Sequence, residues 1–303
     1  MKKIFMAIIA LMMTISASAQ FYIYFSDGTV AKVDSISMIT PTESEDPSIP
    51  SAGIGAFSVS ASKQVTFSPG NLQYHPANNE WRFAESQTDH IGSANSNISA
   101  TYNGWIDLFG WGTGNAPTKS SNDNSDYPTF VDWGINKIGN DAPNTWRTLS
   151  MDEWMYIFYD RPNAQSLFAL GSVSGVYGTI VLPDNWTTPA GVSFVASTNR
   201  GLHWVYDPYG GYYYNSNSNN FLHNTYTLEQ WSKMEQAGAM FLPASGYRRG
   251  TNVSFVQERG FCWASTEYTE DGAYNVAFLS EALYPQTRPG RMSGFSVRLV
   301  KDL

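Results

Sequence analysis

Short runs of alternating apolar and polar residues recur along most of the chain and predict β-strands. Residues 57–86 hold three of these runs, separated by turn residues at 69–70 and 77–79, and predict a meander. Further short apolar segments are expected to form strands at 178–186, 238–248, 260–268, 273–280 and 294–300. The pattern therefore predicts a domain rich in short strands.

Two of these segments divide clearly into two faces, because side chains alternate across a strand. In residues 273–280 the expected core face consists of Tyr274, Val276 and Phe278, and the expected outward face consists of Asn275, Ala277 and Leu279. In the closing strand, Gly294 to Val300, one face carries Phe295, Val297 and Leu299, and the other carries Ser296 and Arg298.

Two segments have helical periodicity. Residues 150–161 begin at Ser150 and have Glu153 three positions later, which together predict a capping box. Residues 227–238 begin at Thr227 and end at a glycine. Each helix has an apolar face that is expected in the core, namely Trp154, Ile157 and Phe158 in the first, and Leu228, Trp231 and Met234 in the second. Strands and helices together predict an α+β fold.

Residues 1–19 are typical of a secretory signal peptide. Lys2 and Lys3 precede an apolar run, and small residues follow up to Ala19, after which we expect cleavage. The apolar run is shorter than the roughly 20 residues that cross a bilayer, and no later run is long enough. The sequence therefore predicts an exported protein without membrane insertion, located in the periplasm, at the cell surface or outside the cell.

The residues after the signal divide into three parts. Residues 20–40 alternate around a Ser-Asp-Gly turn and predict a β-hairpin. Residues 41–52 are acidic and contain several prolines, which is typical of a linker. Residues 53–303 contain no comparable break, so we expect them to form one domain.

Composition narrows the choice of partner. The formal net charge is −8, and the Lys and Arg residues are scattered along the chain. A nucleic acid is not expected as a partner, because its phosphates require a basic surface. Charged residues make up only 15% of the chain, and aromatic residues also make up 15%. A surface of rings, amides and hydroxyls fits an exported recognition protein.

The sequence contains no motif for a known reaction. Gly-x-Ser-x-Gly, His-Glu-x-x-His and a phosphate-binding loop are absent from it. The histidines are too widely spaced for a metal-ligand string: His75, His90, His203 and His223. The candidate carboxylates show no paired motif of the glycosidase type: Asp107, Asp152, Glu153 and Asp184. Residues 121–126 are rich in oxygen ligands but lack the glycine and distal glutamate of a calcium loop, so a solvated turn is favoured. We expect no catalysis, cofactor or metal.

The single cysteine, Cys262, lies between Phe261 and Trp263. It has no second cysteine for an internal disulfide and no recognisable histidine partner to serve as a base. A small buried residue is therefore the favoured interpretation.

The order of several motifs resembles a family of bacterial exported proteins with the C-type-lectin-like fold. The motifs are WRTLSMDEW (146–154), LPDNW (182–186), FLPASGYR (241–248), FCWASTEY (261–268), AYNVAFLS and GFSVRLV. The family includes major paralogous surface domains, relatives of sulfatase-modifying factors and variable proteins of diversity-generating retroelements. The resemblance covers residues 53–303. It implies that the first and last strands of the domain pair, that two helices flank the sheet, and that long loops on one side bind a ligand.

The resemblance also bears on individual residues. It implies that Trp263 packs inside the domain. Relatives that generate formylglycine need two cysteines, and relatives that bind sugars through calcium need Glu-Pro-Asn or Gln-Pro-Asp followed by Trp-Asn-Asp. This chain has neither. In the retroelement branch the diversified positions lie just before the closing strand, which corresponds here to residues 265–295.

That stretch supplies the predicted ligand-binding residues. Extending the outward face of residues 273–280 into the following loop gives Asn275, Leu279, Glu281, Tyr284, Gln286, Arg288 and Arg291. Tyrosine and arginine dominate binding hot spots, and Pro285 and Pro289 restrict the loop, which lowers the entropy lost on binding. An ordinary surface loop with salt-bridged arginines is the alternative for the same residues.

Two further alternatives stay open. Aromatic segments that contain Trp105 and Trp111, and residues 204–221, form a second candidate surface, because rings pack on both sugars and proteins. The expected function is non-catalytic recognition of a protein or a glycan. The alternative is a structural or adhesive component that assembles through its N-terminal hairpin and exposed strands.

Overall fold

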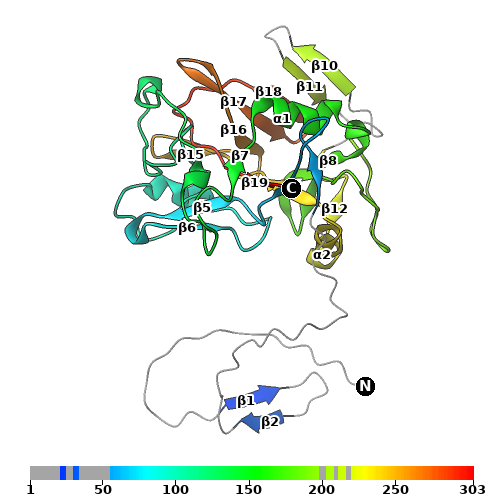
Figure 1. Cartoon of the computed structure of the whole chain (residues 1–303). Coiled ribbons are helices and arrows are strands. Elements are labelled where there is room, and N and C mark those ends of the chain that lie inside the picture. Colours follow the sequence, from blue (N-terminus) through cyan, green and yellow to red (C-terminus); the bar gives the residue numbers. More distant parts are fainter. Residues whose placement is uncertain (1–20, 25–29, 34–54, 198–202, 208–210, 216–219) are drawn as a thin grey trace. The chain divides into compact units, whose positions relative to one another are not determined.

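The computed structural model describes residues 21–24, 30–33, 55–197, 203–207, 211–215 and 220–303. The chain divides into two compact units, Met1–Ile49 and Pro50–Leu303 (Figure 1). The predicted signal peptide and linker lie outside the described residues. In the first unit, β1 (Phe21–Tyr24) and β2 (Val30–Val33) pair antiparallel, as a hairpin requires. No helix in the described ranges is long and apolar enough to span a membrane.

The second unit combines several small, mostly antiparallel sheets with a few helices. The largest sheet has the order β10-β11-β18-β17-β16, with bounds His203–Asp207, Gly211–Asn215, Ala282–Thr287, Gly272–Leu279 and Arg259–Thr269. A second sheet has the order β12-β8-β9-β13, with bounds Thr225–Tyr226, Phe168–Val173, Val176–Val181 and Met240–Pro243. A third has the order β3-β4-β19-β7, with bounds Phe57–Ser58, Gln64–Phe67, Leu299–Asp302 and Arg147–Thr148.

Two hairpins and several short helical turns complete the unit. The hairpins are β5-β6 (Leu72–His75, Glu80–Phe83) and β14-β15 (Tyr247–Arg249, Asn252–Ser254). Turns of 3₁₀ helix lie at Pro76–Asn78, Gly92–Asn97, Asn124–Asp126, Trp133–Ile135 and Ala164–Ser166.

Residues 57–86 form strands, as predicted, but not a single meander. β3 pairs with β4 and β5 pairs with β6, and the two pairs belong to different sheets. The reason is that β19, from the far end of the chain, takes the second edge of β4. Local alternation predicts a strand, whereas the strand's partner depends on residues that are distant in sequence.

The C-terminal strand closes the unit onto its beginning. β19 pairs with β4, so that Val300 lies opposite Phe67 and Asp302 opposite Val65, and it pairs with β7 on its other side. The expected closure is therefore present, although the partner is the second strand of the unit rather than the first. Residues 294–298 were expected to belong to this strand, but their ladder pairing is limited to isolated bridges, such as Phe295 to Phe109.

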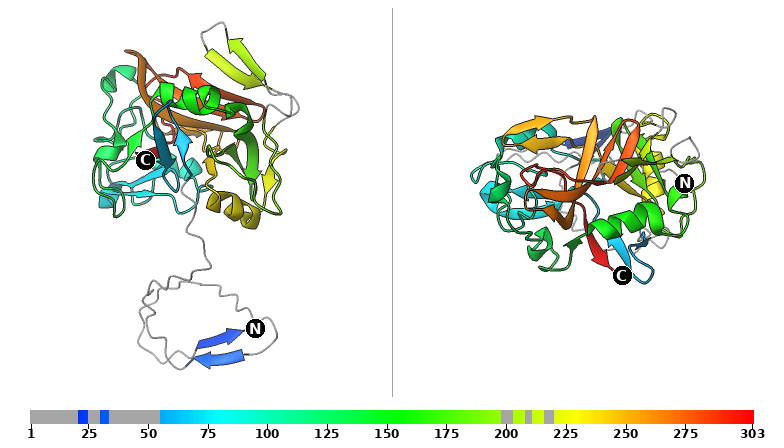
Figure 2. Two further views of the ribbon diagram at one scale, coloured as in Figure 1. Left: turned by 45° about the vertical axis from the view of Figure 1, so that its right-hand side comes forward. Right: turned by 90° about the horizontal axis from the view of Figure 1, so that it is seen from above.

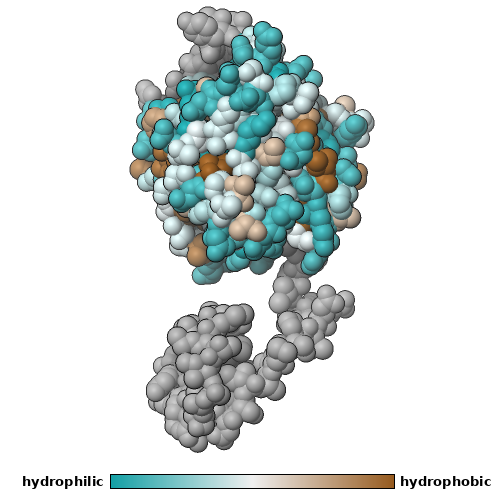
Figure 3. Space-filling view, turned by 90° about the vertical axis from the view of Figure 1, so that its left-hand side faces the viewer, coloured by the Kyte–Doolittle hydropathy of each residue, from teal (hydrophilic) through white to brown (hydrophobic). Residues whose placement is uncertain are grey.

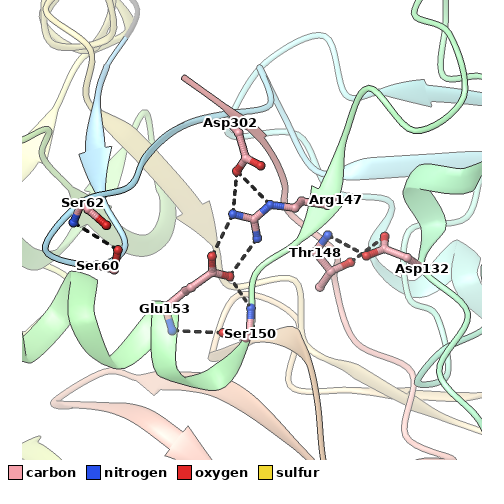
Figure 4. A network of polar contacts seen from close by, with 8 residues as sticks. All are labelled: Ser60, Ser62, Asp132, Arg147, Thr148, Ser150, Glu153 and Asp302. Atoms are coloured by element: carbon pink, nitrogen blue, oxygen red, sulfur yellow. Dashed lines mark hydrogen bonds and ion pairs between the residues drawn. The ribbon is translucent and has the colours of Figure 1, made fainter.

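A network of ion pairs holds the closing strand to α1 (Met151–Met155), as Figure 4 shows. The Arg147 guanidinium donates to both carboxylate oxygens of Glu153 at 2.8 Å and, through Nε at 2.9 Å, to Asp302. Glu153 Oε2 also accepts the Ser150 N–H at 2.8 Å, while Ser150 Oγ accepts the Glu153 N–H at 3.2 Å. The predicted capping box is confirmed, and its carboxylate also helps to anchor the C-terminus.

The two helices pack largely as expected. α1 continues into a π-helical turn, Tyr156–Asp160, and the apolar face containing Trp154 is buried against β16, β17 and β18 (Figures 1 and 2). α2 (Leu228–Gln236) buries Trp231 and Met234, but Leu228 is 59% exposed. The prediction for Leu228 was wrong because a three-residue spacing drifts around a helix, which places Leu228 about 120° from Met234.

Candidate functional site

The predicted ligand-binding residues lie in or beside the five-stranded sheet. β17 and β18 join at Leu279–Ala282, and β16 and β17 join at Thr269–Gly272. The turn end is defined here as Arg259, Phe261, Leu279, Glu281 and Tyr284. The tip end, at the opposite end of the strands, is defined as Tyr268, Tyr274 and Arg288.

The register determines which side chains share a face of this sheet. On the outer face, three rows cross β16, β17 and β18: Trp263–Asn275–Thr287, Phe261–Ala277–Tyr284 and Arg259–Leu279–Ala282. Exposure increases from the first row to the third. On β16, Trp263 is buried, Phe261 is partly exposed and Arg259 is exposed. The opposite face, which includes Tyr274, Val276 and Phe278 as predicted, packs in the core with α1, although Tyr274 at its tip is only partly buried. The outer face therefore opens toward the turn end.

Asn275 was expected to face outward, but it is completely buried. Its Nδ2 donates to the Val276 carbonyl at 3.0 Å, and its Oδ1 accepts the Thr287 hydroxyl. The reason lies in its row, where the Trp263 ring packs 4.5 Å from the Phe295 ring and brings this level of the outer face into the core. Alternation separated the two faces correctly, but it did not show that residues 294–297 cover one of them.

Arg291 was also expected at the surface and is only 2% exposed. Its guanidinium donates to the carbonyls of Tyr127 and Pro128 at 3.2 and 3.1 Å and to Glu267 at 3.1 Å. It also lies 4.5 Å from the Trp111 ring centroid. Arg291 therefore attaches the segment at 127–128 to the sheet, which matches the alternative of a salt-bridged arginine.

The stretch expected to be a loop after residue 280 is largely strand β18. Pro285 and Gln286 lie where the pairing with β17 shifts, which marks a bulge opposite Val276. A bulge tolerates proline because the missing N–H is not needed in the ladder. The bulge and the paired strands on either side make this segment more rigid than a loop.

The remaining predicted residues divide between the two ends of the sheet. Leu279 and Tyr284 are partly exposed and Glu281 is exposed at the turn end, while the partly exposed Gln286 lies in the bulge. Arg288 belongs to the tip end, where its Cζ lies 4.6 Å from the Tyr268 ring centroid and 5.8 Å from that of Tyr274. The structure therefore does not bring all seven residues into one site.

Sequence analysis missed a neighbouring aromatic group beside the turn end. Tyr247 of β14 lies 5.8 Å from Phe255 and 5.7 Å from Phe261 between ring centroids, and the Arg259 Cζ lies 4.0 Å from the Phe255 ring centroid. All three rings are partly exposed. The available signal was the close alternation of aromatic residues and arginines between 247 and 261.

The loop that carries Phe255 has a strained backbone. Phe255 and Gln257 have φ angles of 58° and 63°. Such left-handed conformations cost about 1–3 kcal/mol for residues other than glycine and persist only when surrounding contacts enforce them. Here the Gln257 N–H donates to the Ala244 carbonyl at 2.8 Å, and Gln257 Oε1 accepts the Tyr177 N–H at 3.0 Å. These contacts hold Phe255 beside Arg259.

His90 supports the same loop. Its Nδ1 lies 3.2 Å from the Thr88 carbonyl, and its Nε2 lies 2.9 Å from Nε2 of Gln257. A carbonyl only accepts, so Nδ1 carries the proton and Nε2 accepts from the Gln257 amide. His90 therefore has a structural hydrogen-bonding role, like the one expected for the separate histidines.

The second candidate surface from the sequence joins the same sheet. β11 pairs with β18, with Tyr214 opposite Leu283. The side chains of 204–219 lie outside the described residues. Trp111 is buried and donates to the Ala264 carbonyl at 3.0 Å, so it belongs to the core rather than to a ligand surface. Trp105 is partly exposed and lies 3.9 Å from the Arg82 Cζ.

Other chemical groups singled out in the sequence have structural partners. Asp107 is fully buried, burial raises its pKa, and its oxygens accept from the Ile91 N–H at 2.9 Å and the Asn95 amide at 2.8 Å. Residues 121–126 form a turn in which Asp123 accepts from the Ser125 N–H at 2.9 Å. Across the described ranges, no three His, Cys, Asp or Glu side chains gather closely enough to hold a metal.

Cys262 is buried, as predicted, and burial raises the pKa of its thiol to about 12. A thiol that stays protonated at neutral pH is a poor nucleophile. Trp263 is likewise fully buried, and its Nε1 donates to the Phe109 carbonyl at 2.8 Å. The segment around Cys262 is therefore part of the scaffold beneath the outer face.

Two hollows in the described surface are not lined by the predicted residues, although Arg291 contacts Trp111, Tyr127 and Pro128 at the first of them. One has a volume of about 200 Å³ and is lined by residues that include Trp111, Lys119 and Tyr127. The other has a volume of about 330 Å³ and is lined by residues that include Phe67 and Glu235. The turn end on the outer face and the tip end, whose Tyr274 belongs to the opposite face, thus remain the candidate recognition surfaces.

Comparison with known proteins gives one match. Residues 210–300 match a family described as a domain of unknown function (DUF8237), which covers less than half of the chain. The matched range runs from β11 to β19 and so includes β16, β17 and β18, which carry the turn end and the tip end. No curated protein and no solved structure matches the chain.

Proposed function

We propose that this protein is an exported, non-catalytic recognition protein with a C-type-lectin-like domain. It binds a protein or glycan ligand through exposed parts of the five-stranded sheet, either at the turn end on the outer face or at the tip end, whose Tyr274 belongs to the opposite face. The observation that carries the proposal is the placement of partly exposed tyrosines and arginines on paired strands at both ends. These residue types dominate hot spots, and a rigid support lowers the entropy lost on binding.

The fold supports the same proposal. β19 pairs with β4, the second strand of the unit, where the resemblance implies pairing with the first, and α1 packs on the face opposite to the turn end. The bound ligand would therefore contact side chains whose strands are anchored from behind. The surface seen in Figure 3 is mostly hydrophilic or intermediate, with small separate hydrophobic spots.

Paired alanine variants at each end test this proposal. We expect either Leu279→Ala with Tyr284→Ala, or Tyr268→Ala with Arg288→Ala, to weaken ligand binding at least about tenfold, because truncating a hot-spot residue costs more than about 1 kcal/mol. The measurement is binding of the chain lacking residues 1–19 to glycan and protein arrays. Lys301→Ala, at an exposed position of β19, is the matched control.

The melting temperature of each variant separates binding from folding. We expect the tip-end pair to melt within a few degrees of the unmodified chain, because Tyr268 is 45% exposed. Unchanged binding in both paired variants would refute the proposal. Self-association that disappears when residues 20–51 are deleted, seen by sedimentation, would then favour the structural alternative.

A further inference from the structure

We propose that the turn end, together with β14 and the loop that follows β15, binds an acidic polysaccharide whose uronic acid carboxylates meet Arg249 and Arg259. This inference rests on the proposed function and names the ligand class for one of its two ends. It rests on three features of this surface. Two guanidinium groups have no ion-pair partner among the described residues, aromatic rings pack together between them, and hydrogen bonds fix the backbone before a ligand binds.

The two arginines belong to one continuous row of contacts. The Arg249 Cζ lies 6.0 Å from the Tyr247 ring centroid, Tyr247 lies 5.8 Å from Phe255, and the Arg259 Cζ lies 4.0 Å from Phe255. A guanidinium above an aromatic ring is held in orientation by the ring while its N–H groups remain able to donate. The row therefore presents two oriented cationic groups to one ligand.

Neither cation is neutralised within the part of the chain that the structure describes. Arg249 and Arg259 are exposed and have no carboxylate within ion-pair distance there, although their neighbours Glu258 and Glu281 are also exposed. Other arginines do pair with carboxylates, as Arg147 and Arg161 illustrate. In a chain with a net charge of −8, two exposed and unpaired arginines mark a site for an anion. The planar guanidinium fork matches a carboxylate group.

The rings favour a sugar over an acidic peptide. Phe261 stacks on Phe295 with ring centroids 4.7 Å apart, and Tyr247 meets Phe261 edge-on at 5.7 Å. These rings pack against one another and leave no pocket between them. A peptide is usually anchored by a side chain that inserts into such a pocket. A pyranose ring instead lies on such a layer through its C–H groups. Carboxylates recur along a polyuronate, so one chain can present a carboxylate to each arginine.

The backbone of this surface is organised before a ligand arrives. Phe255 keeps its left-handed conformation because Gln257 is held by Ala244, Tyr177 and His90. Arg259 begins β16, and its backbone N–H donates to the Phe255 carbonyl at 3.0 Å. Binding then requires little ordering of this loop. The entropy lost on binding is therefore small, which raises the affinity of a shallow surface.

The test uses titration calorimetry of the chain lacking residues 1–19 with polygalacturonate, alginate and hyaluronate as acidic probes. Dextran serves as the neutral control. We expect at least one acidic probe to bind and dextran not to bind, with an affinity that falls as salt concentration rises. The variants are Arg249→Gln, Arg259→Gln and, as the control, Lys301→Gln, which removes an exposed positive charge from β19. We expect each of the two arginine variants to weaken binding at least about tenfold and Lys301→Gln to leave it unchanged.

Several outcomes would overturn this inference. They are no binding of any acidic probe, equal loss in Lys301→Gln, or equal binding of poly-glutamate, which would show that charge alone is recognised. The variants change exposed side chains, and circular dichroism would verify that they stay folded. If the acidic probes fail while the arrays still reveal a ligand that depends on Tyr284 or Tyr268, the inference is wrong and the proposed recognition function stands.

Discussion

Replacing Arg298 with alanine is expected to lower the free energy of unfolding by about 3–5 kcal/mol. Arg298 is completely buried, and burial lowers the pKa of its guanidinium to about 10. It donates to the Ser68 carbonyl and to Gln87 Oε1, both at 3.3 Å, and also to the Phe241 carbonyl. Its removal would take this donor away from the buried Ser68 and Phe241 carbonyls, while Gln87 Oε1 would still accept the Phe241 N–H at 2.6 Å, and it would also leave a cavity.

The effect should be large because Arg298 joins separate parts of the fold. Ser68 follows β4, Phe241 lies in β13, and Gln87 donates through Nε2 to Glu235 of α2 at 2.8 Å. Loss of the guanidinium therefore weakens the contact between two sheets and α2. The sequence placed Arg298 on the opposite face of the closing segment from Phe295, but both faces are buried.

Unfolding in denaturant measures this effect, provided that the slope of the transition stays constant among variants. Arg298→Met keeps most of the volume, so its loss of stability isolates the hydrogen bonds. Lys301→Ala, three positions further along at an exposed site, should change stability by less than about 0.5 kcal/mol. A loss below about 1 kcal/mol in Arg298→Ala would show that the buried network does not join the sheets.

Replacing Asp184 with asparagine is expected to lower the free energy of unfolding at neutral pH by about 3 kcal/mol. Asp184 Oδ1 accepts from the Arg161 guanidinium at 3.0 Å, and its Oδ2 accepts from the Ser58 N–H at 2.8 Å and from Gln64 at 2.9 Å. Arg161 is only 2% exposed. Without the carboxylate, its charge would lie in the interior with no counter-charge among the described residues.

The same carboxylate makes stability depend on pH. Burial alone would raise the pKa of Asp184, but hydrogen bonds from Ser58, Gln64 and Arg161, together with the charge of Arg161, lower it overall. The unfolded chain therefore binds the proton more readily than the folded chain. The stabilisation is fully present above the unfolded pKa of about 3.9 and is lost as pH falls through the folded pKa.

Denaturant unfolding at about pH 7 and at progressively lower pH tests this dependence. The difference between the unmodified chain and Asp184→Asn should shrink as the carboxylate becomes protonated. Asp160→Asn, which changes an exposed carboxylate, is the control and should differ little at any pH. A difference that stays constant into acid would contradict the assigned role of the carboxylate charge.

The elements that the sequence predicted well are those decided by nearby residues. Ser150 and Glu153 form the capping box, and Trp154 and Phe158 are buried, because a helix start and a helix face depend on residues a few positions apart. Cys262 was correctly interpreted as buried for a similar reason, since it lies between two large aromatic residues in a strand.

The candidate site was predicted only in part, because exposure is decided by distant segments. Alternation assigned Asn275 to the outer face, but Phe295 and Trp263 cover that level. Arg291 is turned inward by carbonyls at 127–128. Phe255 was missed because its backbone conformation depends on Tyr177 and His90, through Gln257, and no local pattern indicates those contacts.

The most direct test of the central claim is amide chemical-shift mapping of the ¹⁵N-labelled chain during titration with oligogalacturonate. The claim is that the turn end binds the ligand, while the sheet that contains β4 and β19 does not change on binding. The expected result is a set of shifts concentrated at residues 247–261 and 279–284, with β4 and β19 unchanged. Shifts concentrated around the hollow beside Trp111, at the tip end, or along β4 and β19 would contradict it.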